Sequence, residues 1–482
     1  MVGPDYHSPT PRTPAAWSAT SSPSSPSRPT PEPVAAAAWW TSFQDPELTS
    51  LIQRAAGADL DLQTAALRVT EARAQRDTAA AQLWPSLNGN TSWQQTLLSE
   101  TTPTGKLFTS VGKSGLPVTS QFIIPNPYGT YQAGFDASWE VDLFGHARRN
   151  VEASKASLAA AVEDSHDAEL TLLGDVARAY IDLRGAQLKR AVTVQNIATM
   201  TELLDLASQR RGAGLSNDID VARAAAEVTL AKAGLPLLER QIAADINQLS
   251  RLIDREPGAL KAELETARPV PPVPPQVPVG LPSDLARRRP DIRGAEARLH
   301  AATAQVGVAV ADLYPRLTMQ VNTGYQSEDF GRLLDWASRF SNLGPQVELP
   351  IFDAGRRRAT VRLQDARARE AAVDYARTVL GALHDVDNAL TAYDTEQTRR
   401  ASLQTTDVQN RIAVGLALDR YKSGVGSFLD VLDAERTQQQ TELELADSTT
   451  AVSTDLVALY KALGGGWDAP ELAAAASGAA AR

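Results

Sequence analysis

Alternation of apolar and polar residues marks four short segments of the chain as β-strands with two unlike faces. It is clearest over 128–141, where Tyr131, Phe135 and Trp139 share one face and polar residues or glycine occupy the other. The four segments are 87–97, 128–141, 316–326 and 340–349. An ordinary half-solvated antiparallel sheet has the same period. Because the segments form two hairpins, each entered and left by a helix, we interpret them as bilayer-crossing strands.

A second pattern covers most of the remaining chain: apolar residues recur every three or four positions, as in Val379, Leu383, Val386 and Leu390. This spacing is typical of amphipathic helices. A helix of 65–70 residues is about 100 Å long, far beyond most globular helices. Taken alone, such alanine-rich segments would indicate a soluble coiled coil. The expected helices cover 145–211, 216–255, 353–422 and 427–463.

The chain also repeats itself, because three local sequences recur in the same order at offsets of 230, 208 and 210 residues. We infer an internal duplication, and a longer insertion at 98–127 in the first copy accounts for the larger first offset. The matching pairs are Ala81–Leu87 with Ala311–Leu317, Glu140–Arg149 with Glu348–Arg357, and Arg210–Gly214 with Arg420–Gly424.

Composition breaks divide the chain into five parts. Nine prolines within the first 33 residues and a second proline-rich stretch past the middle predict extended segments without a core of their own. The expected parts are an extended N-terminal segment (1–50), a first repeat (51–265), a proline-rich equatorial connector (266–290), a second repeat (291–463) and a flexible tail (464–482).

Charge and composition exclude several kinds of chemistry. The 482 residues include no cysteine and five scattered histidines, so we expect no disulfide, no metal site, no cofactor and no enzymatic activity. A formal net charge of −10 argues against nucleic-acid binding, which needs an excess of Lys and Arg. No run of residues reaches 18 apolar positions, so we expect no membrane-spanning helix.

Four strands are too few to close a barrel, and open sheet edges are not tolerated in hydrocarbon. We therefore expect a barrel shared between chains: two chains would supply eight strands and three would supply twelve. The expected fold is mainly α with membrane β, in which a long α-helical coiled-coil barrel continues into a 12-stranded β-barrel formed by a trimer. A trimer would carry a charge of about −30, which favours cations if the excess lines the lumen.

Five motifs spread over nearly the whole chain make the resemblance specific. They are Val2–Tyr6, Leu285–Ile292, Leu349–Arg356, Arg420–Val425 and Tyr460–Trp467. With them the sequence resembles the outer-membrane factor family of TolC type, in the lipoprotein branch that serves resistance-nodulation-division multidrug efflux pumps.

The resemblance implies a homotrimer in the Gram-negative outer membrane, in contact with its lipid and extending into the periplasm. Its implied partners are a periplasmic adaptor (membrane fusion) protein and an inner-membrane resistance-nodulation-division transporter. Relatives carry a lipid-bearing cysteine directly before the motif that begins at Val2, where this sequence has Met1. We expect a palmitate-type lipid anchor in the native protein.

The same resemblance assigns roles at the two helix-turn-helix tips, 210–220 and 420–433. Leu429 would form an apolar constriction ring, and Asp433 an acidic ring beside it, around a three-fold axis. Arg420 and Tyr421 would tether neighbouring hairpins, with Asp218 or Asp220 as their partners.

Local helix chemistry offers simpler roles for other tip residues. Ser427 with Asp430, and Ser216 with Asp218, have the spacing of helix N-caps followed by an acidic first turn. Gly214 and Gly424 are expected in left-handed turns.

The function predicted from these observations is a passive outer-membrane channel of a tripartite efflux pump. It would export small molecules such as drugs, stay closed at its periplasmic tip and be opened by partners. Two alternatives are an outer-membrane duct for type I protein secretion and a soluble coiled-coil scaffold.

Overall fold

A computed structural model describes residues 1–10, 13–18, 25–32, 36–103, 106 and 126–467. Most of the expected insertion at 98–127 and of the expected tail at 464–482 lies outside the described residues. The chain forms two compact units, each built from separated stretches. The sheet unit comprises Met1–His7, Ala72–Leu158 and Leu299–Ala371; the helical unit comprises Ser8–Glu71, Ala159–Arg298 and Ala372–Arg482.

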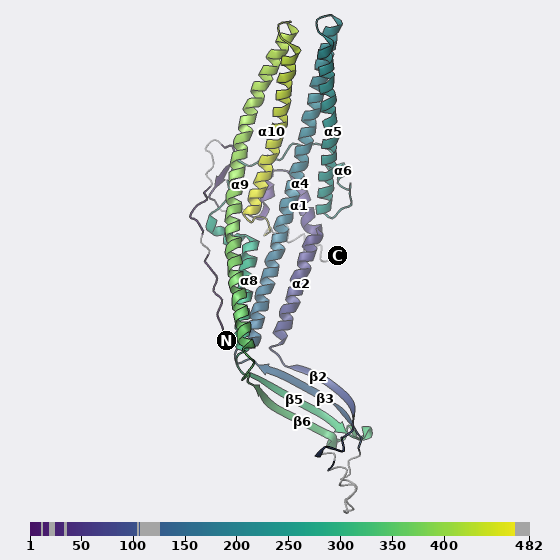
Figure 1. The fold of residues 1–482 in the computed structure, drawn as a ribbon, viewed down its shortest axis with the longest axis vertical. Helices are drawn as coiled ribbons and strands as arrows, with labels where there is room; N and C mark the ends of the chain where they lie inside the picture. Colours follow the sequence, from purple (N-terminus) through teal and green to yellow (C-terminus); the bar gives the residue numbers. More distant parts are fainter. Residues whose placement is uncertain (11–12, 19–24, 33–35, 104–105, 107–125, 468–482) are drawn as a thin grey trace, which may run out of the picture. The chain divides into compact units, whose positions relative to one another are not determined.

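The compact units therefore do not follow the two repeats, because each unit takes residues from both. The sheet explains why. Its strands are β2 (Ser86–Thr96), β3 (Tyr128–Val141), β5 (Arg316–Ser327) and β6 (Arg339–Glu348). They form one antiparallel sheet in the order β2-β3-β5-β6 (Figure 1). The hairpin of one repeat thus pairs along one edge, through β3 and β5, with the hairpin of the other.

The register keeps most apolar residues of the four strands on one face. Phe135 pairs with Gly89 on one side and Thr323 on the other, and Ala133 pairs with Tyr325. The opposite face carries polar residues, such as Asp136, whose carboxylate accepts hydrogen bonds from the side-chain amides of neighbouring strand residues. The two faces thus differ as the alternating sequence requires.

The helices confirm the duplication, because matching helices of the two repeats have equal lengths. The sheet hairpins follow α2 (Leu60–Ala81) and α8 (Pro290–Ala311), each of 22 residues. They are followed by α4 (His146–Gly212) and α9 (Arg356–Lys422), each of 67 residues. Each repeat ends with a helix of 35 residues, α5 (Asp218–Leu252) or α10 (Phe428–Ala462). Across the described residues, the structure contains no helix that combines the length and apolarity needed to cross a membrane.

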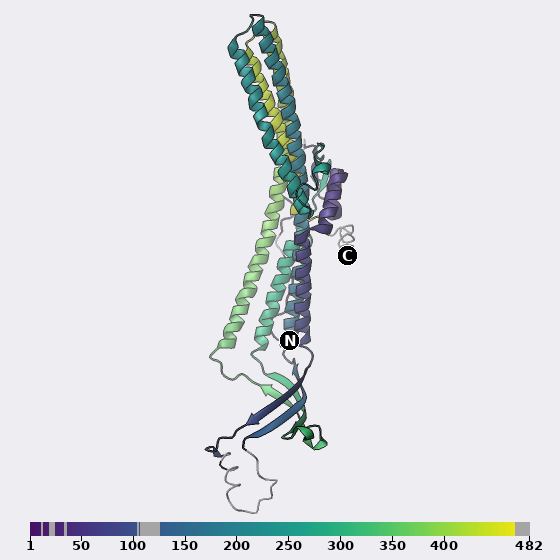
Figure 2. The same ribbon diagram turned by 90° about the vertical axis from the view of Figure 1, so that its right-hand side faces the viewer.

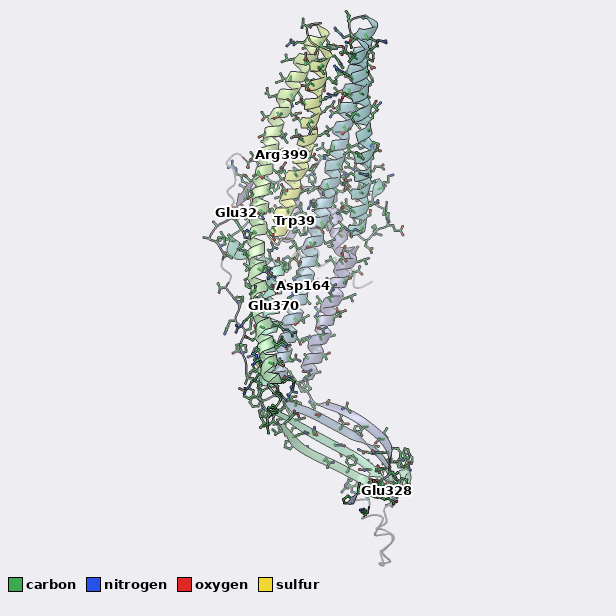
Figure 3. The ribbon with its side chains drawn as sticks, viewed as in Figure 1. Glu32, Trp39, Asp164, Glu328, Glu370 and Arg399 are labelled. Carbon is green, nitrogen blue, oxygen red and sulfur yellow. The ribbon has the colours of Figure 1, made fainter. Side chains whose placement is uncertain are left out.

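In the helical unit, α4 turns into α5 and α9 turns into α10, which gives two long hairpins (Figures 1 and 2). Shorter elements surround them: β1 (Arg28–Thr30), η1 (Ala36–Phe43), α1 (Pro46–Ala58), α6 (Lys261–Leu264), β4 (Gln276–Pro278), η3 (Pro282–Asp284) and α7 (Leu285–Arg288). The ring of Trp39, labelled in Figure 3, stacks on Tyr460 near the end of α10, with ring centroids 5.3 Å apart.

Two serines of the N-terminal segment bind α9. The side chains of Ser18 and Ser25 donate hydrogen bonds of 2.7 Å to Asp387 and Asp394. β1 then pairs in parallel with β4 of the proline-rich connector. A segment without a core of its own is thus held by polar contacts with a helix and a short strand pair.

A buried ion pair anchors α1 to α4. Arg184 is fully buried, and its guanidinium donates a 2.6 Å hydrogen bond to the carboxylate of Glu47. The same guanidinium donates to the Gln187 side chain at 2.7 Å and to the carbonyl of Thr266 at 2.9 Å. The buried charge is thereby paired and hydrogen-bonded, as its burial demands.

Two ends of the sheet carry aromatic residues on its apolar face. At the end that joins β2 to β3, Tyr131 lies between Trp93 and Phe330, with ring centroids 6.3 and 5.4 Å away. At the helix end, Trp139 donates a hydrogen bond to the carbonyl of Leu83. Tyr131 and Trp139 are eight residues apart on β3, which corresponds to about 26 Å along the strand and, at a tilt of about 40°, to a height of about 20 Å. An apolar band about 25 Å tall between aromatic girdles is typical of outer-membrane sheets.

Candidate functional site at the helical hairpin tips

Both hairpin tips turn through the same short sequence pattern. Gly214 has a φ of 72° and Gly424 a φ of 82°, the left-handed conformation that the sequence predicts. The backbone amides of Leu215 and Val425 then donate to the carbonyls of Arg210 and Arg420, five residues earlier. These bonds close the C-terminal ends of α4 and α9.

The helices that leave the tips begin with N-caps, one as predicted and one displaced by a residue. Ser427 and Asp430 form a reciprocal capping box, which confirms the expected role of both. In the first tip, Asn217 and not Ser216 caps the helix, accepting a hydrogen bond from the Asp220 amide. The prediction for Ser216 is wrong because its hydroxyl donates instead to the Asp220 carboxylate at 2.7 Å.

A compact apolar cluster joins the two hairpins just behind their tips. Tyr421 and Phe428 lie at its centre with ring centroids 5.4 Å apart. Because all four helices contribute, the two hairpins are held as a pair. The buried members are Met200, Leu203, Ala207, Ala224, Val228, Tyr421, Phe428, Val431 and Leu432.

Arg210 provides a polar link between the hairpins that the sequence reading missed. Its guanidinium stacks over the Tyr421 ring, 4.6 Å from the centroid, and donates a 3.0 Å hydrogen bond to the carbonyl of Lys422. A second link is the ion pair between Arg436 of α10 and Glu227 of α5. Only the repeat offset, which aligns Arg210 with Arg420, could have drawn attention to this position.

Leu429 and Asp433 lie on the face of α10 that points away from the apolar cluster. Leu429 is 50% exposed and Asp433 is also exposed, whereas Phe428, Val431 and Leu432 are buried. Because residues four apart are neighbours on a helix, Leu429 and Asp433 form one adjacent apolar and acidic pair.

The first hairpin carries a different pair at the equivalent positions. The repeat offset of 210 residues aligns Leu429 with Ile219, which is 57% exposed, and Asp433 with Arg223, which is exposed. The two tips thus both present an apolar side chain, but they differ in the sign of the adjacent charge.

Within the single chain, the expected partners of Arg420 are engaged elsewhere. Asp218 forms a 2.6 Å ion pair with Arg211, and the Asp220 carboxylate accepts a hydrogen bond from the Ser216 hydroxyl. No ion pair among the described residues involves Arg420, which is exposed. Tyr421 is buried, and its hydroxyl has no hydrogen-bond partner in the described part of the chain.

The tips offer exposed apolar surface and charged side chains. Within the described ranges, no three His, Asp or Glu side chains lie close enough to hold a metal ion. Exposed apolar residues lie at the tips of both paired hairpins.

Comparisons with known proteins agree over nearly the full length of the chain. A family model described as "Outer membrane efflux protein" matches residues 51–254 and 281–465. The chain is 31% identical to nodulation protein T of Rhizobium leguminosarum bv. viciae, covering 98% of this chain and 92% of that protein. It is 33% identical to the pyoverdine export outer membrane protein OpmQ of Pseudomonas aeruginosa, covering 89% and 87%. The solved structure of the outer-membrane channel OprN matches with a TM-score of 0.86 and 33% identity, covering 97% of this chain and 99% of that one.

Proposed function

The chain belongs to the outer membrane efflux protein family, and from that premise we propose that it is the outer-membrane channel of a tripartite efflux pump. The family match confirms the resemblance seen in the sequence motifs. The observation that carries the proposal is the pairing of a four-stranded sheet, apolar on one face, with two long helical hairpins whose tips expose apolar residues.

The proposed assembly is a homotrimer. A four-stranded sheet leaves β2 and β6 as open edges, and an edge in hydrocarbon needs a partner strand. Three copies would supply twelve strands, enough to enclose an aqueous lumen with the polar face inside.

The proposed gate consists of Leu429 and Asp433 from each of three copies. Three exposed leucines around a narrow axis would form an apolar collar that repels water, and three carboxylates one turn away would attract cations. Arg420 and Tyr421, with Asp218 or Asp220 of a neighbouring hairpin, are proposed tethers that hold the tip closed. A partner that separates the hairpins would open the passage.

The proposed partners are a periplasmic adaptor (membrane fusion) protein and an inner-membrane resistance-nodulation-division transporter. The proposed cargo is a small molecule such as a drug; the relative OpmQ is a pyoverdine export protein. The lipid anchor expected from the motif at Val2 is part of the same proposal.

Conductance across a planar bilayer tests both the channel and its gate. The purified full chain is expected to conduct weakly and to prefer cations. Leu429→Ala should raise the conductance several-fold because it removes the collar, and Asp433→Ala should lower the preference for cations. The matched control is Ile219→Ala, which removes an equally exposed side chain from the equivalent position of the other hairpin and should leave conductance unchanged.

The results separate the channel from the gate. Absence of conductance in every form, together with a monomeric mass in detergent, would overturn the channel. Conductance that is identical in wild type, Leu429→Ala and Asp433→Ala would overturn only the assignment of the gate residues.

A further inference from the structure

The apolar face of the sheet is hollowed by a groove of about 700 Å³, within the size range of ligand sites. Its floor consists of small residues on three neighbouring strands, Gly89, Ala133 and Thr323. Two larger side chains also line the groove: Phe135, which lies between Gly89 and Thr323 in the strand register, and Trp336, which follows β5. The groove therefore runs across β2, β3 and β5 and is lined partly by aromatic side chains.

Arg339 stands at one end of this apolar groove. It pairs with Tyr325 in the register of β5 and β6, on the same face as the groove floor. Its guanidinium lies 3.8 Å from the centre of the Trp336 ring. Among the described residues no carboxylate forms an ion pair with Arg339, whereas the nearby Arg332 is paired with Asp335 at 3.4 Å. The groove thus ends in an exposed cation held in place by an aromatic ring.

Chain connectivity places this end of the groove away from the helices. β2 and β6 join helices at their other ends, while the turn that begins at Glu328, labelled in Figure 3, joins β5 to β6 here. If the helices occupy the periplasm, as proposed above, this end of the sheet lies at the outer leaflet of the membrane. The occupant must then be a molecule with an apolar chain and an anionic head at that depth.

We propose that this groove binds a phosphorylated, acylated glycolipid of the outer leaflet, with an acyl chain along the small-residue floor and a phosphate on Arg339. The proposal rests on the proposed placement of the sheet in the outer membrane. An acyl chain buries apolar surface that water would otherwise contact, and a basic residue near the headgroups attracts anionic lipid. The guanidinium fork also matches the geometry of phosphate oxygens.

The test is native mass spectrometry of the detergent-solubilised full chain, titrated with bisphosphorylated lipid A or with the same lipid lacking its phosphates. Arg339→Gln should weaken binding of the phosphorylated lipid about fivefold and leave the phosphate-free lipid unaffected. Gly89→Leu should weaken binding of both lipids because it fills the floor. A β-carbon at Gly89 would lie at an ordinary 3.6 Å from the Phe135 ring, so the strand can accept the side chain.

Two control variants make the same chemical changes outside the groove. Arg332→Gln removes an arginine from the same turn, and Gly344→Leu adds the same side chain to β6 at a position with nothing within 4 Å. Both should bind lipid as wild type does. Equal lipid binding by all five proteins would overturn the lipid site, and so would burial of the groove by a second copy in place of lipid.

Conductance of the same samples keeps this proposal separate from the proposed channel. Intact conductance with unchanged lipid binding overturns the lipid site alone. Lipid binding that responds to Arg339→Gln as expected, in a protein that never conducts, supports the lipid site and overturns the channel. If Gly89→Leu does not assemble, Arg339→Gln with its Arg332→Gln control still decides the outcome.

Discussion

Asp245 on α5 is a buried carboxyl group with only one of its oxygens hydrogen-bonded. It is 5% exposed, and the Gln241 side chain donates a 2.7 Å hydrogen bond to Oδ1. Oδ2 has no partner among the described residues. Burial raises the pKa of Asp245 from 3.8 to about 6; the bond from Gln241 opposes the rise and the negative charge of Asp182 adds to it. The folded chain therefore favours the protonated form of this group.

Asp245→Asn is expected to stabilise the protein at neutral pH and to have little effect in acid. The unfolded chain releases this proton near pH 3.8 and the folded chain near pH 6, so stability is highest below this window and falls as pH rises through it. Above about pH 6 the gain from the substitution should approach 3 kcal/mol at most. Thermal unfolding of wild type and Asp245→Asn at pH 3.5 and pH 7.5 measures this gain in the free energy of unfolding.

Asp182→Asn is the matched control for this prediction. The negative charge of Asp182 acts on Asp245. Asp182 itself is partly exposed and forms an ion pair with Arg178 at 3.7 Å. Its substitution should lower the pKa of Asp245 and give a smaller gain. An equal gain from Asp245→Asn at both pH values would contradict the role of burial.

At the scale of elements, α4 and α10 of the helical unit come into close contact at a glycine. A β-carbon on Gly185 of α4 would lie 2.4 Å from the hydroxyl oxygen and 2.5 Å from the methyl carbon of Thr450 on α10. Real β-carbons do not approach other atoms so closely, so the spacing of α4 and α10 depends on this glycine. The alanine-rich sequence permits close packing in general, but it does not reveal which glycine is in contact.

Gly185→Ala is expected to destabilise the protein by about 1–3 kcal/mol because it overpacks this contact. Thr450→Ala removes both clashing atoms, so the double variant should recover most of the loss. Gly381→Ala on α9 serves as the control, since nothing lies within 4 Å of the added carbon. There alanine should stabilise the helix by up to about 1 kcal/mol. Additive effects of Gly185→Ala and Thr450→Ala in denaturation experiments would refute the contact.

At the scale of the whole molecule, β2 and β6 are the outer strands of the sheet, and their outward-facing backbone groups would determine how copies of the chain pair. The two edges belong to different repeats, so the duplication produces one continuous sheet of four strands whose outer edges have no partner strand in the described part of the chain. A closed barrel requires the β2 edge of one copy to pair with the β6 edge of the next. We therefore expect the sheet to be complete only in an oligomer.

The absence of cysteine makes this arrangement directly testable by cross-linking. Asn90→Cys on β2 is combined in turn with Phe340→Cys, Asn342→Cys or Gly344→Cys, positions that share one face of β6. Oxidation should link copies into dimers and trimers for the pair whose β-carbons meet, because disulfides need close β-carbons. The native mass should be three times the 51.5 kDa of one chain. Only monomers in both experiments would contradict a trimer.

The sequence by itself determined the elements and their duplication, because periodicity and caps depend on neighbouring residues. The strand ranges it predicts differ by at most a few residues from β2, β3, β5 and β6, and the Ser427 cap follows from local spacing. Tertiary structure alone decided the pairing of β3 with β5, the stacking of Arg210 on Tyr421 and the burial of Asp245. These features depend on which side chains meet from distant parts of the chain, and no local pattern encodes that. The proposed lipid groove also depends on tertiary structure. Gly89 and Arg339 line one surface only because the four strands align in a single sheet.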